Sequence, residues 1–378
     1  MAYKLYPRAK LAGRVALPPS KSEAIRAALL LRLSGGDPYE ALRGYAGQML
    51  CDDICHAIEA ACALDRCPDA GESAALLRMT VCIQAALYGR VRVRAARRLW
   101  ERGLWEAEEC FRMPLEYSEG LVTGTAEVNA DGRYEIDCSR TSQFLSGLLI
   151  ALPLLPRECE IKVIKGSVSK PYSDMTADMV KRFGGDVEIA GGGFITRSSC
   201  YEKPDELTIH GDESYAAVFR AANLLGGRVE IEGSNEASFQ PDKDFLKLAA
   251  LCDCDISDHP DLAPLLAVTA CGKTGETVLR GTARLKTKES DRESGAVRLI
   301  NDLGGSAENE GGRIMINGTG GLRGGAFDPR GDHRMCFAAA VASLICEEPV
   351  VILDTECVNK SAPGFWRDWK ELLEGGME

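Results

Sequence analysis

Hydroxyl and positively charged side chains lie at the start of an apolar segment near the N-terminus. Lys21, Ser22 and Arg26 lead into the apolar residues 27–33, and Ser20 or Ser22 is suited to cap the first turn of a helix there. The free N–H groups and the dipole at a helix start attract anions. Lys21 adds a mobile charge, and Arg26 adds a planar guanidinium that can bind a carboxylate or a phosphate. The sequence therefore predicts an anion site at this position.

The same arrangement recurs along the chain. Polar residues lie at or within two turns of the start of further apolar segments: Arg78, the run Thr141-Ser142-Gln143, Asp261 and Arg334. If each of two domains points its helix starts in one direction, two facing domains would enclose a cleft with a positive field. In this way a chain with a formal net charge of −11 could bind a small polyanion.

Six segments share one plan, in which a polar residue, a strongly apolar helix, a turn and a β-branched strand follow one another. The helices are expected to begin near Ser22, Ser73, Ser142, Ser214, Asp261 and His333. Strands are expected over 90–94, 160–164, 228–232, 276–280 and 349–353. Residues 143–155 and 333–345 are apolar nearly all round, so these two helices should be central and buried. Amphipathic helices over 174–183 and 291–303 should end at glycines that act as left-handed caps.

Two domains are expected, because 378 residues exceed what one ordinary hydrophobic core accommodates. The pattern favours an α/β (α+β) chain with an N-terminal domain over 14–210 and a C-terminal domain over 1–13 plus 211–378. Each domain would contain three repeats, and the crossover would lie near His210.

Composition limits the partners and the cellular location. The acidic balance argues against a nucleic-acid partner. The N-terminus lacks the apolar core of a signal peptide, and the longest apolar run, 148–155, is too short to span a membrane. Most of the 15 cysteines lie in apolar segments, which is typical of core residues in a reducing cytoplasm. The pairs Cys51/Cys55 and Cys252/Cys254 lack a second pair at zinc spacing, so no metal site is expected.

Seven short motifs occur in one order along almost the whole chain, at 19–26, 140–145, 168–172, 260–264, 288–292, 331–335 and 359–361. They include Pro19-Ser20-Lys21-Ser22, Lys288-Glu289-Ser290-Asp291-Arg292 and Gly331-Asp332-His333-Arg334. With these motifs the chain resembles the enolpyruvyl transferase family, and within it the 5-enolpyruvylshikimate-3-phosphate (EPSP) synthases. The resemblance implies a two-domain fold with three βαβαββ-type repeats and buried parallel helices in each domain, and an active site in the interdomain cleft.

The resemblance implies transfer of the enolpyruvyl group of phosphoenolpyruvate to the 5-hydroxyl of shikimate 3-phosphate, a step toward chorismate and the aromatic amino acids. By this resemblance, the residues that would bind shikimate 3-phosphate are Lys21, Ser22, Arg26, Thr141, Ser142, Gln143, Ser169, Tyr172, Asp261 and Lys288. Those that would bind phosphoenolpyruvate are Lys21, Ala74, Arg102, Gln143, Arg292, Arg334 and Lys360. No cofactor or metal is implied, and a cytoplasmic monomer is expected.

The reaction needs a base for the attacking hydroxyl and an acid for the methylene carbon of phosphoenolpyruvate. Asp261, at the start of an apolar helix, is assigned as the base. Glu289, Lys21 or Lys360 could deliver the proton to the methylene carbon, and the sequence leaves that choice open.

Three positions depart from the family pattern. Ala74 stands where many members have glycine, and its methyl group predicts weak inhibition by glyphosate. Gly103 follows Arg102 where proline is usual, which should loosen that loop. Arg284 stands where an asparagine is frequent, so no contact is inferred for it.

Two other functions fit parts of the pattern. The related transferases that act on UDP-N-acetylglucosamine often carry a reactive cysteine beside the phosphoenolpyruvate site, and residues 99–103 contain none. A catalytically degenerate relative that acts as a binding protein is the second alternative. The joint presence of Lys21, Asp261, Glu289, Arg334 and Lys360 argues against a lost activity.

Overall fold

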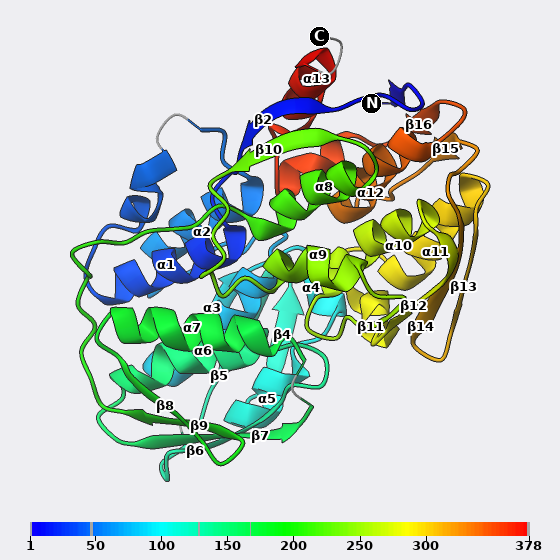
Figure 1. Cartoon of the computed structure of the whole chain (residues 1–378). Helices are drawn as coiled ribbons and strands as arrows, with labels where there is room; N and C mark the ends of the chain where they lie inside the picture. The colour runs from blue at the N-terminus through cyan, green and yellow to red at the C-terminus, as the bar shows by residue number, and fades with distance from the viewer. Residues whose placement is uncertain (1, 46–47, 128, 167, 376–378) are drawn as a thin grey trace. The chain divides into compact units, whose positions relative to one another are not determined.

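The computed structural model describes residues 2–45, 48–127, 129–166 and 168–375, and the chain divides into two compact units (Figure 1). Unit 1 contains residues 1–18, 49–51 and 210–378, and unit 2 contains residues 19–48 and 52–209. The expected boundary after residue 13 falls inside β2 (Ala12–Ala16), which pairs in parallel with β10 (Arg228–Glu232). Because this pairing belongs to unit 1, the chain enters unit 2 only at Pro19.

Unit 2 combines helices with two sheets. Its helices are α1 (Lys21–Leu33), α2 (Asp52–Cys62), α3 (Ala74–Tyr88), α4 (Arg97–Glu101), α5 (Trp105–Phe111), α6 (Gln143–Ala151) and α7 (Lys170–Arg182). One sheet has the order β3-β5-β4, formed by Arg90–Arg94, Leu121–Thr125 and Leu115–Ser118. The other has the order β6-β7-β9-β8, formed by Arg133–Asp137, Cys159–Lys165, Gly193–Arg197 and Asp186–Ala190.

Unit 1 also combines helices with sheets. Its helices are α8 (Glu213–Leu224), α9 (Phe245–Ala249), α10 (Ala263–Cys271), α11 (Arg292–Asp302), α12 (His333–Ala342) and α13 (Phe365–Gly375). The four-stranded sheet has the order β11-β12-β14-β13, formed by Asp253–Asp255, Thr274–Arg280, Arg313–Thr319 and Ser306–Glu310. The three-stranded sheet has the order β1-β16-β15, formed by Tyr3–Leu5, Val350–Ile352 and Gly325–Phe327.

The expected repeat is complete once in each unit. In unit 2 the order is β6, α6, β7, α7, β8, β9, with β6 and β7 parallel and the last two strands antiparallel. In unit 1 the order β11, α10, β12, α11, β13, β14 gives the same pairing pattern. The α/β prediction is therefore confirmed, and each expected strand is present within a few residues of its predicted ends.

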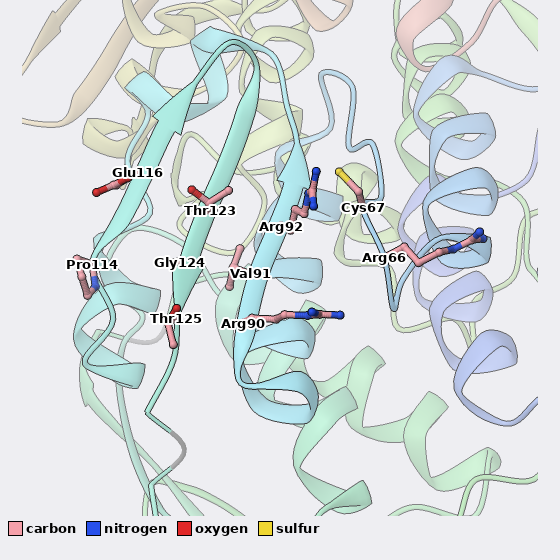
Figure 2. A pocket seen from close by; sticks show the side chains of 10 residues that line it. All are labelled: Arg66, Cys67, Arg90, Val91, Arg92, Pro114, Glu116, Thr123, Gly124 and Thr125. Atoms are coloured by element: carbon pink, nitrogen blue, oxygen red, sulfur yellow. The ribbon is translucent and has the colours of Figure 1, made fainter.

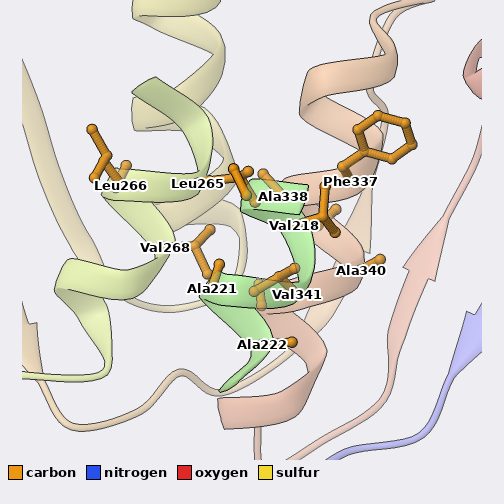
Figure 3. Packing of buried hydrophobic residues seen from close by; sticks show 14 of the residues in the cluster. Val218, Ala221, Ala222, Leu265, Leu266, Val268, Phe337, Ala338, Ala340 and Val341 are labelled. Atoms are coloured by element: carbon orange, nitrogen blue, oxygen red, sulfur yellow. The ribbon is translucent and has the colours of Figure 1, made fainter. Parts of the chain in front are cut away.

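The helices that are apolar all round are buried, as predicted. Every residue of α10 and of α12 is buried, and so is every residue of α6 after Gln143. In unit 1, small side chains such as Ala221 on α8 and Ala338 on α12 let these helices approach α10, where Leu265 fills the space between them (Figure 3). A helix without a polar face has no exposed side, so its polar N-terminal residues are the groups it can present to a ligand.

Two further findings concern the whole described chain. All 15 cysteines are free, and those expected in the core (Cys82, Cys271, Cys336 and Cys346) are buried. Within the described ranges, no helix has the length and apolar character needed to cross a membrane.

Candidate active site

The start of α1 holds a lysine against a buried carboxylate. Ser20 caps the helix by accepting a hydrogen bond from the Glu23 backbone N–H at 3.4 Å, so it is Ser20 and not Ser22 that serves as the cap. Lys21, the first residue of α1, has its Nζ 3.0 Å from Oδ2 of Asp53 on α2. The Lys21 side chain is 19% exposed and that of Asp53 is 6% exposed. This pair fixes the lysine at the helix start while leaving its tip accessible.

Arg26 ties three helix starts of unit 2 together from a buried position. Its Nε donates to Thr176 Oγ1 at 2.7 Å and its Nη1 donates to the Ser22 carbonyl at 2.7 Å. Its Nη2 donates to Ser146 Oγ and to the Tyr172 carbonyl. Burial lowers the pKa of Arg26 to about 10, which leaves the side chain charged at neutral pH. These contacts make Arg26 a link between α1, α6 and α7.

The starts of α6 and α7 meet through hydroxyl groups. Ser142 Oγ donates to the Ser169 carbonyl at 3.2 Å, so the Ser142 side chain does not cap α6. Thr141 Oγ1 instead accepts from the Gln143 backbone N–H at 3.2 Å. Ser169 has a left-handed backbone with φ 58°, which turns the chain directly into α7. The guanidinium carbon of Arg26 lies 5.9 Å from the centre of the Tyr172 ring.

Gln143 connects this group to α3. Arg78 Nη1 donates to Gln143 Oε1 at 2.8 Å, and the Arg78 guanidinium lies over the Phe144 ring at 5.4 Å. Ala74 is the buried first residue of α3, one turn before Arg78. The structure therefore brings together the predicted residues on α1, α3, α6 and α7, and it adds Arg78, which the sequence placed near a helix start without a role.

Arg102 lies between α4 and α5 in a segment held by its neighbours. Arg140 Nη2 donates to the Arg102 carbonyl at 3.1 Å, and the Arg140 guanidinium lies 3.6 Å from the centre of the Trp105 ring. Gly103 has φ +81°, and a Cβ there would lie 2.4 Å from the Trp105 ring. The glycine expected to loosen this segment is thus the residue that allows its close packing.

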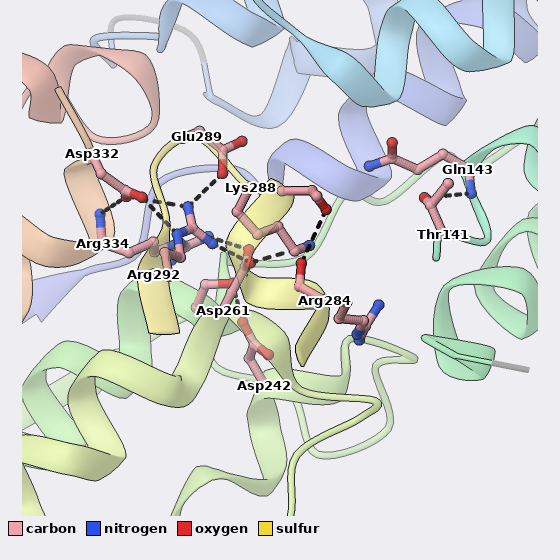
Figure 4. A network of polar contacts seen from close by, with 12 residues as sticks. Thr141, Gln143, Asp242, Asp261, Arg284, Lys288, Glu289, Arg292, Asp332 and Arg334 are labelled. Atoms are coloured by element: carbon pink, nitrogen blue, oxygen red, sulfur yellow. Dashed lines mark hydrogen bonds and ion pairs between the residues drawn. The ribbon is translucent and has the colours of Figure 1, made fainter. Parts of the chain in front are cut away.

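In unit 1, one buried arginine organises three carboxylates (Figure 4). Arg292 is 1% exposed, and its Nε and Nη2 donate to both oxygens of Asp332 at 2.7 and 3.2 Å. Its Nη1 donates to Asp261 Oδ1 and its Nη2 donates to Glu289 Oε2, each at 2.7 Å. Four of the five N–H groups of a guanidinium are used in this way. The contact with Asp332 is bidentate and those with Asp261 and Glu289 are single, and such charge-assisted hydrogen bonds position the carboxylates around Arg292.

Asp261 lies at the centre of the cations. Besides Arg292, its Oδ2 accepts from Arg334 Nη2 at 3.2 Å, and Lys288 Nζ lies 3.9 Å from its Oδ1. Burial by itself raises the pKa of Asp261, but the three surrounding cations outweigh burial and hold the pKa well below its usual range. The side chain is nonetheless 24% exposed. Asp261 is therefore a carboxylate at neutral pH that a ligand can reach.

The start of α12 supplies the second arginine. Asp332 caps α12 by accepting from the Arg334 backbone N–H at 2.9 Å, and it also accepts from Ser290 Oγ at 2.9 Å. One buried aspartate thus positions both arginines. Lys360 ends the short helix η7 (Glu356–Lys360), which packs against α12.

Lys288 differs from the arginines in how firmly it keeps its proton. Burial lowers the pKa of Lys288 to about 8, although the charge of Asp261 acts in the opposite direction. The cationic character of this part of the cluster therefore weakens in mildly alkaline solution.

Several partners were not predicted from the sequence. Asp53 carries no motif signal, because its partnership with Lys21 depends on how α2 packs. Asp332 belongs to the motif Gly331-Asp332-His333-Arg334, and an aspartate directly before a helix indicates a cap. Asp242 and Ser214 are buried and hydrogen-bonded to each other although they are 28 residues apart in sequence.

A cavity of about 820 Å³ lies elsewhere on unit 2, along the sheet β3-β5-β4 (Figure 2). Arg90 and Arg92 of β3 line it together with Arg66 and Cys67 of the preceding segment. None of the predicted site residues line this cavity. Across the described ranges, no group of three or more His, Cys, Asp or Glu side chains is arranged to hold a metal ion.

Comparison with known proteins gives the family. The family described as EPSP synthase (3-phosphoshikimate 1-carboxyvinyltransferase) matches residues 115–251 and 248–369. The 3-phosphoshikimate 1-carboxyvinyltransferase of Clostridium perfringens strain 13 is 30% identical, and the match covers 97% of both chains. The chain belongs to the EPSP synthase family.

Other members of the EPSP synthase family give consistent matches. The Clostridium kluyveri 3-phosphoshikimate 1-carboxyvinyltransferase is 30% identical over 96% of this chain and 95% of its own length. A solved EPSP synthase of Acinetobacter baumannii superimposes with a TM-score of 0.75 at 16% identity and covers 98% of both chains. The structural match establishes the shared two-domain fold, and the sequence matches establish the family.

Proposed function

We propose that this chain transfers the enolpyruvyl group of phosphoenolpyruvate to the 5-hydroxyl of shikimate 3-phosphate and releases inorganic phosphate. The observation that carries the proposal is the cluster around Asp261, where one accessible carboxylate lies between Arg292, Arg334 and Lys288. Both substrates carry a phosphate and a carboxylate, so they require several cations and hydrogen-bond donors.

We assign shikimate 3-phosphate to the helix starts of unit 2. Ser142 and Ser169, which meet at the starts of α6 and α7, would contact its phosphate together with Thr141. Lys21, Ser22 and Gln143 would hold the remaining polar groups, and Tyr172 would lie against the ring. Because four of the five N–H groups of Arg26 are already used within the protein, its main contribution would be to hold Tyr172 and Ser22 in position.

We assign phosphoenolpyruvate chiefly to cations. Arg334 donates one hydrogen bond to Asp261, and its buried Nε has no hydrogen-bond partner among the described residues, so donors remain for an anion. Arg292 has one N–H left for the ligand after its four internal bonds. Lys360 of unit 1 and Lys21, Arg102 and Gln143 of unit 2 remain the other predicted ligands of phosphoenolpyruvate, and the methyl group of Ala74 would limit the space available to an inhibitor.

The proposed chemistry is an addition followed by an elimination. Asp261 takes the proton of the 5-hydroxyl while the 5-oxygen of shikimate 3-phosphate bonds to C2 of phosphoenolpyruvate, and the methylene carbon receives a proton to become a methyl group. The resulting tetrahedral intermediate then loses a proton from that methyl group as the C2–O bond to phosphate breaks. The surrounding cations stabilise the negative charge carried by the phosphate and carboxylate groups. Asp261 becomes a better base when an incoming anion draws Arg334 away from it.

The proton for the methylene carbon could come from Glu289, Lys21 or Lys360. Glu289 is 16% exposed and is fixed by Arg292 Nη2, which positions its carboxyl group. We keep all three as candidates, and single substitutions followed by exchange of solvent deuterium into the methylene group would distinguish them.

The experiment is a phosphate-release assay with phosphoenolpyruvate and one of two acceptors. We expect release that depends on shikimate 3-phosphate and none with UDP-N-acetylglucosamine. Release with the nucleotide sugar alone would support the other transferase activity. Tight binding of both proposed substrates without release would support the degenerate binding protein.

A further inference from the structure

A buried carboxyl group beside the cluster has no part in the mechanism above. Asp242 lies in the short helix η3 (Pro241–Asp244) and is 1% exposed. Figure 4 draws it next to Asp261 but without a contact to either arginine. The charges of Asp261 and Arg334 both act on it, so it belongs to the surroundings of the proposed phosphoenolpyruvate site.

The two oxygens of Asp242 have different environments. Oδ2 accepts a hydrogen bond from Ser214 Oγ on α8. Oδ1 is buried and accepts no hydrogen bond from any described residue. An ionised oxygen without a donor is costly in a buried position because a charge is buried without a hydrogen bond, whereas protonation removes the charge. The environment of Asp242 therefore favours the neutral carboxylic acid over the carboxylate.

The charges that face Asp242 add to this preference. Asp261 and Asp212 are like charges, and Arg334 is the opposing cation. The other charged or titratable groups on η3 and on the elements that pack against it are Lys243, Asp244, Glu213, Tyr215, Arg220, Lys247 and His259. Burial lowers the pKa of His259, so its imidazole is neutral at any pH above the usual pKa of histidine.

These surroundings place the ionisation of Asp242 in an unusual range. Burial and the charge of Asp261 raise its pKa to about 7, although Arg334 and the Ser214 hydrogen bond act in the opposite direction. The neighbouring Asp261 is ionised throughout the same range. Two adjacent carboxyl groups with pKa values pushed apart are typical of sites that divide charge between them.

We propose that Asp242 is a positioning residue whose protonation sets the charge around Arg334, the neutral acid favouring phosphoenolpyruvate and the carboxylate opposing it. This inference rests on the proposed function. A carboxylate at Asp242 adds a third negative charge beside Asp212 and Asp261, and so reduces the attraction of Arg334 for an incoming anion. Phosphoenolpyruvate binding should in turn draw a proton onto Asp242.

The test compares the pH dependence of kcat/KM for phosphoenolpyruvate in the unmodified chain and in Asp242→Asn. Asparagine has the shape of the neutral acid and still accepts from Ser214, but it cannot ionise. If only the neutral form binds well, apparent affinity falls about tenfold one pH unit above the ionisation. We therefore expect the ratio of unmodified to variant activity to fall about tenfold between pH 6 and pH 8. The ionisations of the substrates and of Lys288 affect the two proteins alike, so their effects cancel in this ratio.

Two further variants separate this role from a structural one. In Ser214→Ala the carboxylate loses its donor, so the ionisation of Asp242 should move to higher pH. Asp244→Asn removes the same charge two residues along the same helix, and it should leave the profile unchanged. A purely structural role for Asp242 would lower the activity of Asp242→Asn equally at every pH.

Calorimetry gives a readout that does not require turnover. With phosphoenolpyruvate alone, in buffers of different ionisation enthalpy near pH 7.5, the unmodified chain should take up a larger fraction of a proton than Asp242→Asn, because the substrate and Lys288 contribute equally in the two proteins. Identical pH profiles and equal proton uptake in the two proteins would overturn the inference. Absence of phosphate release by the unmodified chain at every pH would instead overturn the proposed function.

Discussion

Replacement of Asp261 by alanine should separate catalysis from binding. A general base in the transition state contributes about 10²- to 10⁴-fold to the rate, which corresponds to roughly 2.7–5.5 kcal/mol. We therefore expect kcat to fall by at least two orders of magnitude. Because the substitution removes an anion from between Arg292 and Arg334, the KM for phosphoenolpyruvate should stay the same or decrease.

The same substitution should lower stability by a limited amount. Breaking a fully buried ion pair costs about 3–5 kcal/mol, but Asp261 is 24% exposed, and Arg292 keeps its contacts with Asp332 and Glu289. A loss of about 2–3 kcal/mol follows, which lowers the Tm of a chain of 378 residues by roughly 3–4 °C. The variant should therefore be folded at assay temperature.

The measurements are phosphate release under saturating substrates, phosphoenolpyruvate binding by calorimetry, and thermal unfolding. Asp302→Ala serves as a matched control, because Asp302 pairs with Arg298 in an exposed ion pair of the same unit. It should change neither kcat nor KM. Near-normal turnover in Asp261→Ala would refute the role of Asp261 as the base, and loss of phosphoenolpyruvate binding would refute the assignment of the arginines.

Three other outcomes follow from individual residues. Burial lowers the pKa of Lys288 to about 8, so at saturating phosphoenolpyruvate, where Asp242 no longer limits binding, kcat/KM for shikimate 3-phosphate should fall as pH rises through that value, and Lys288→Arg should abolish this decline; an unchanged decline in the variant would exclude Lys288 as its source. The enzyme should be weakly inhibited by glyphosate, and Ala74→Gly should lower the inhibitor concentration that halves activity; a sensitive enzyme unaffected by the substitution would contradict the role of the methyl group. Gly103→Ala should destabilise the chain by about 1–3 kcal/mol in denaturant unfolding and reduce activity, because it combines a left-handed backbone with a Cβ 2.4 Å from the Trp105 ring. Gly191→Ala, at φ +57° with open space around it, is the control, and equal losses in the two variants would show that the Trp105 contact is irrelevant.

The sequence predicted the elements well because their signals are local. The starts of α6, α10 and α12 coincide with polar residues in front of apolar runs, and the runs themselves are buried. Hydrophobic pattern and cap residues are properties of a few adjacent positions, so no tertiary information is needed to recognise them.

The contacts among the site residues could not be predicted in the same way. Ser142 was suited to cap α6, but its hydroxyl donates to the Ser169 carbonyl because the start of α7 lies beside it. Arg26 was suited to bind an anion, but contacts within the protein, including those to Thr176 and Ser146, use four of its five N–H groups. In both cases the partner is more than 25 residues away in sequence, and the choice between ligand and protein depends on packing.

Gly103 illustrates a further limit of prediction from the sequence. Its lack of a side chain suggested a loose segment, whereas the structure uses the missing Cβ for contact with the Trp105 ring. A glycine in a sequence is compatible with mobility and with close packing, and only the neighbours decide between them.

The most direct test follows both substrates to their products by nuclear magnetic resonance. With phosphoenolpyruvate and shikimate 3-phosphate, the enzyme should convert the phosphorus signal of phosphoenolpyruvate into that of inorganic phosphate and form an enolpyruvyl ether at the 5-oxygen. Asp261→Ala should bind both compounds and leave their spectra unchanged for the same period. Persistence of both substrates with the unmodified enzyme, or attachment of the enolpyruvyl group at another oxygen, would contradict the proposed reaction.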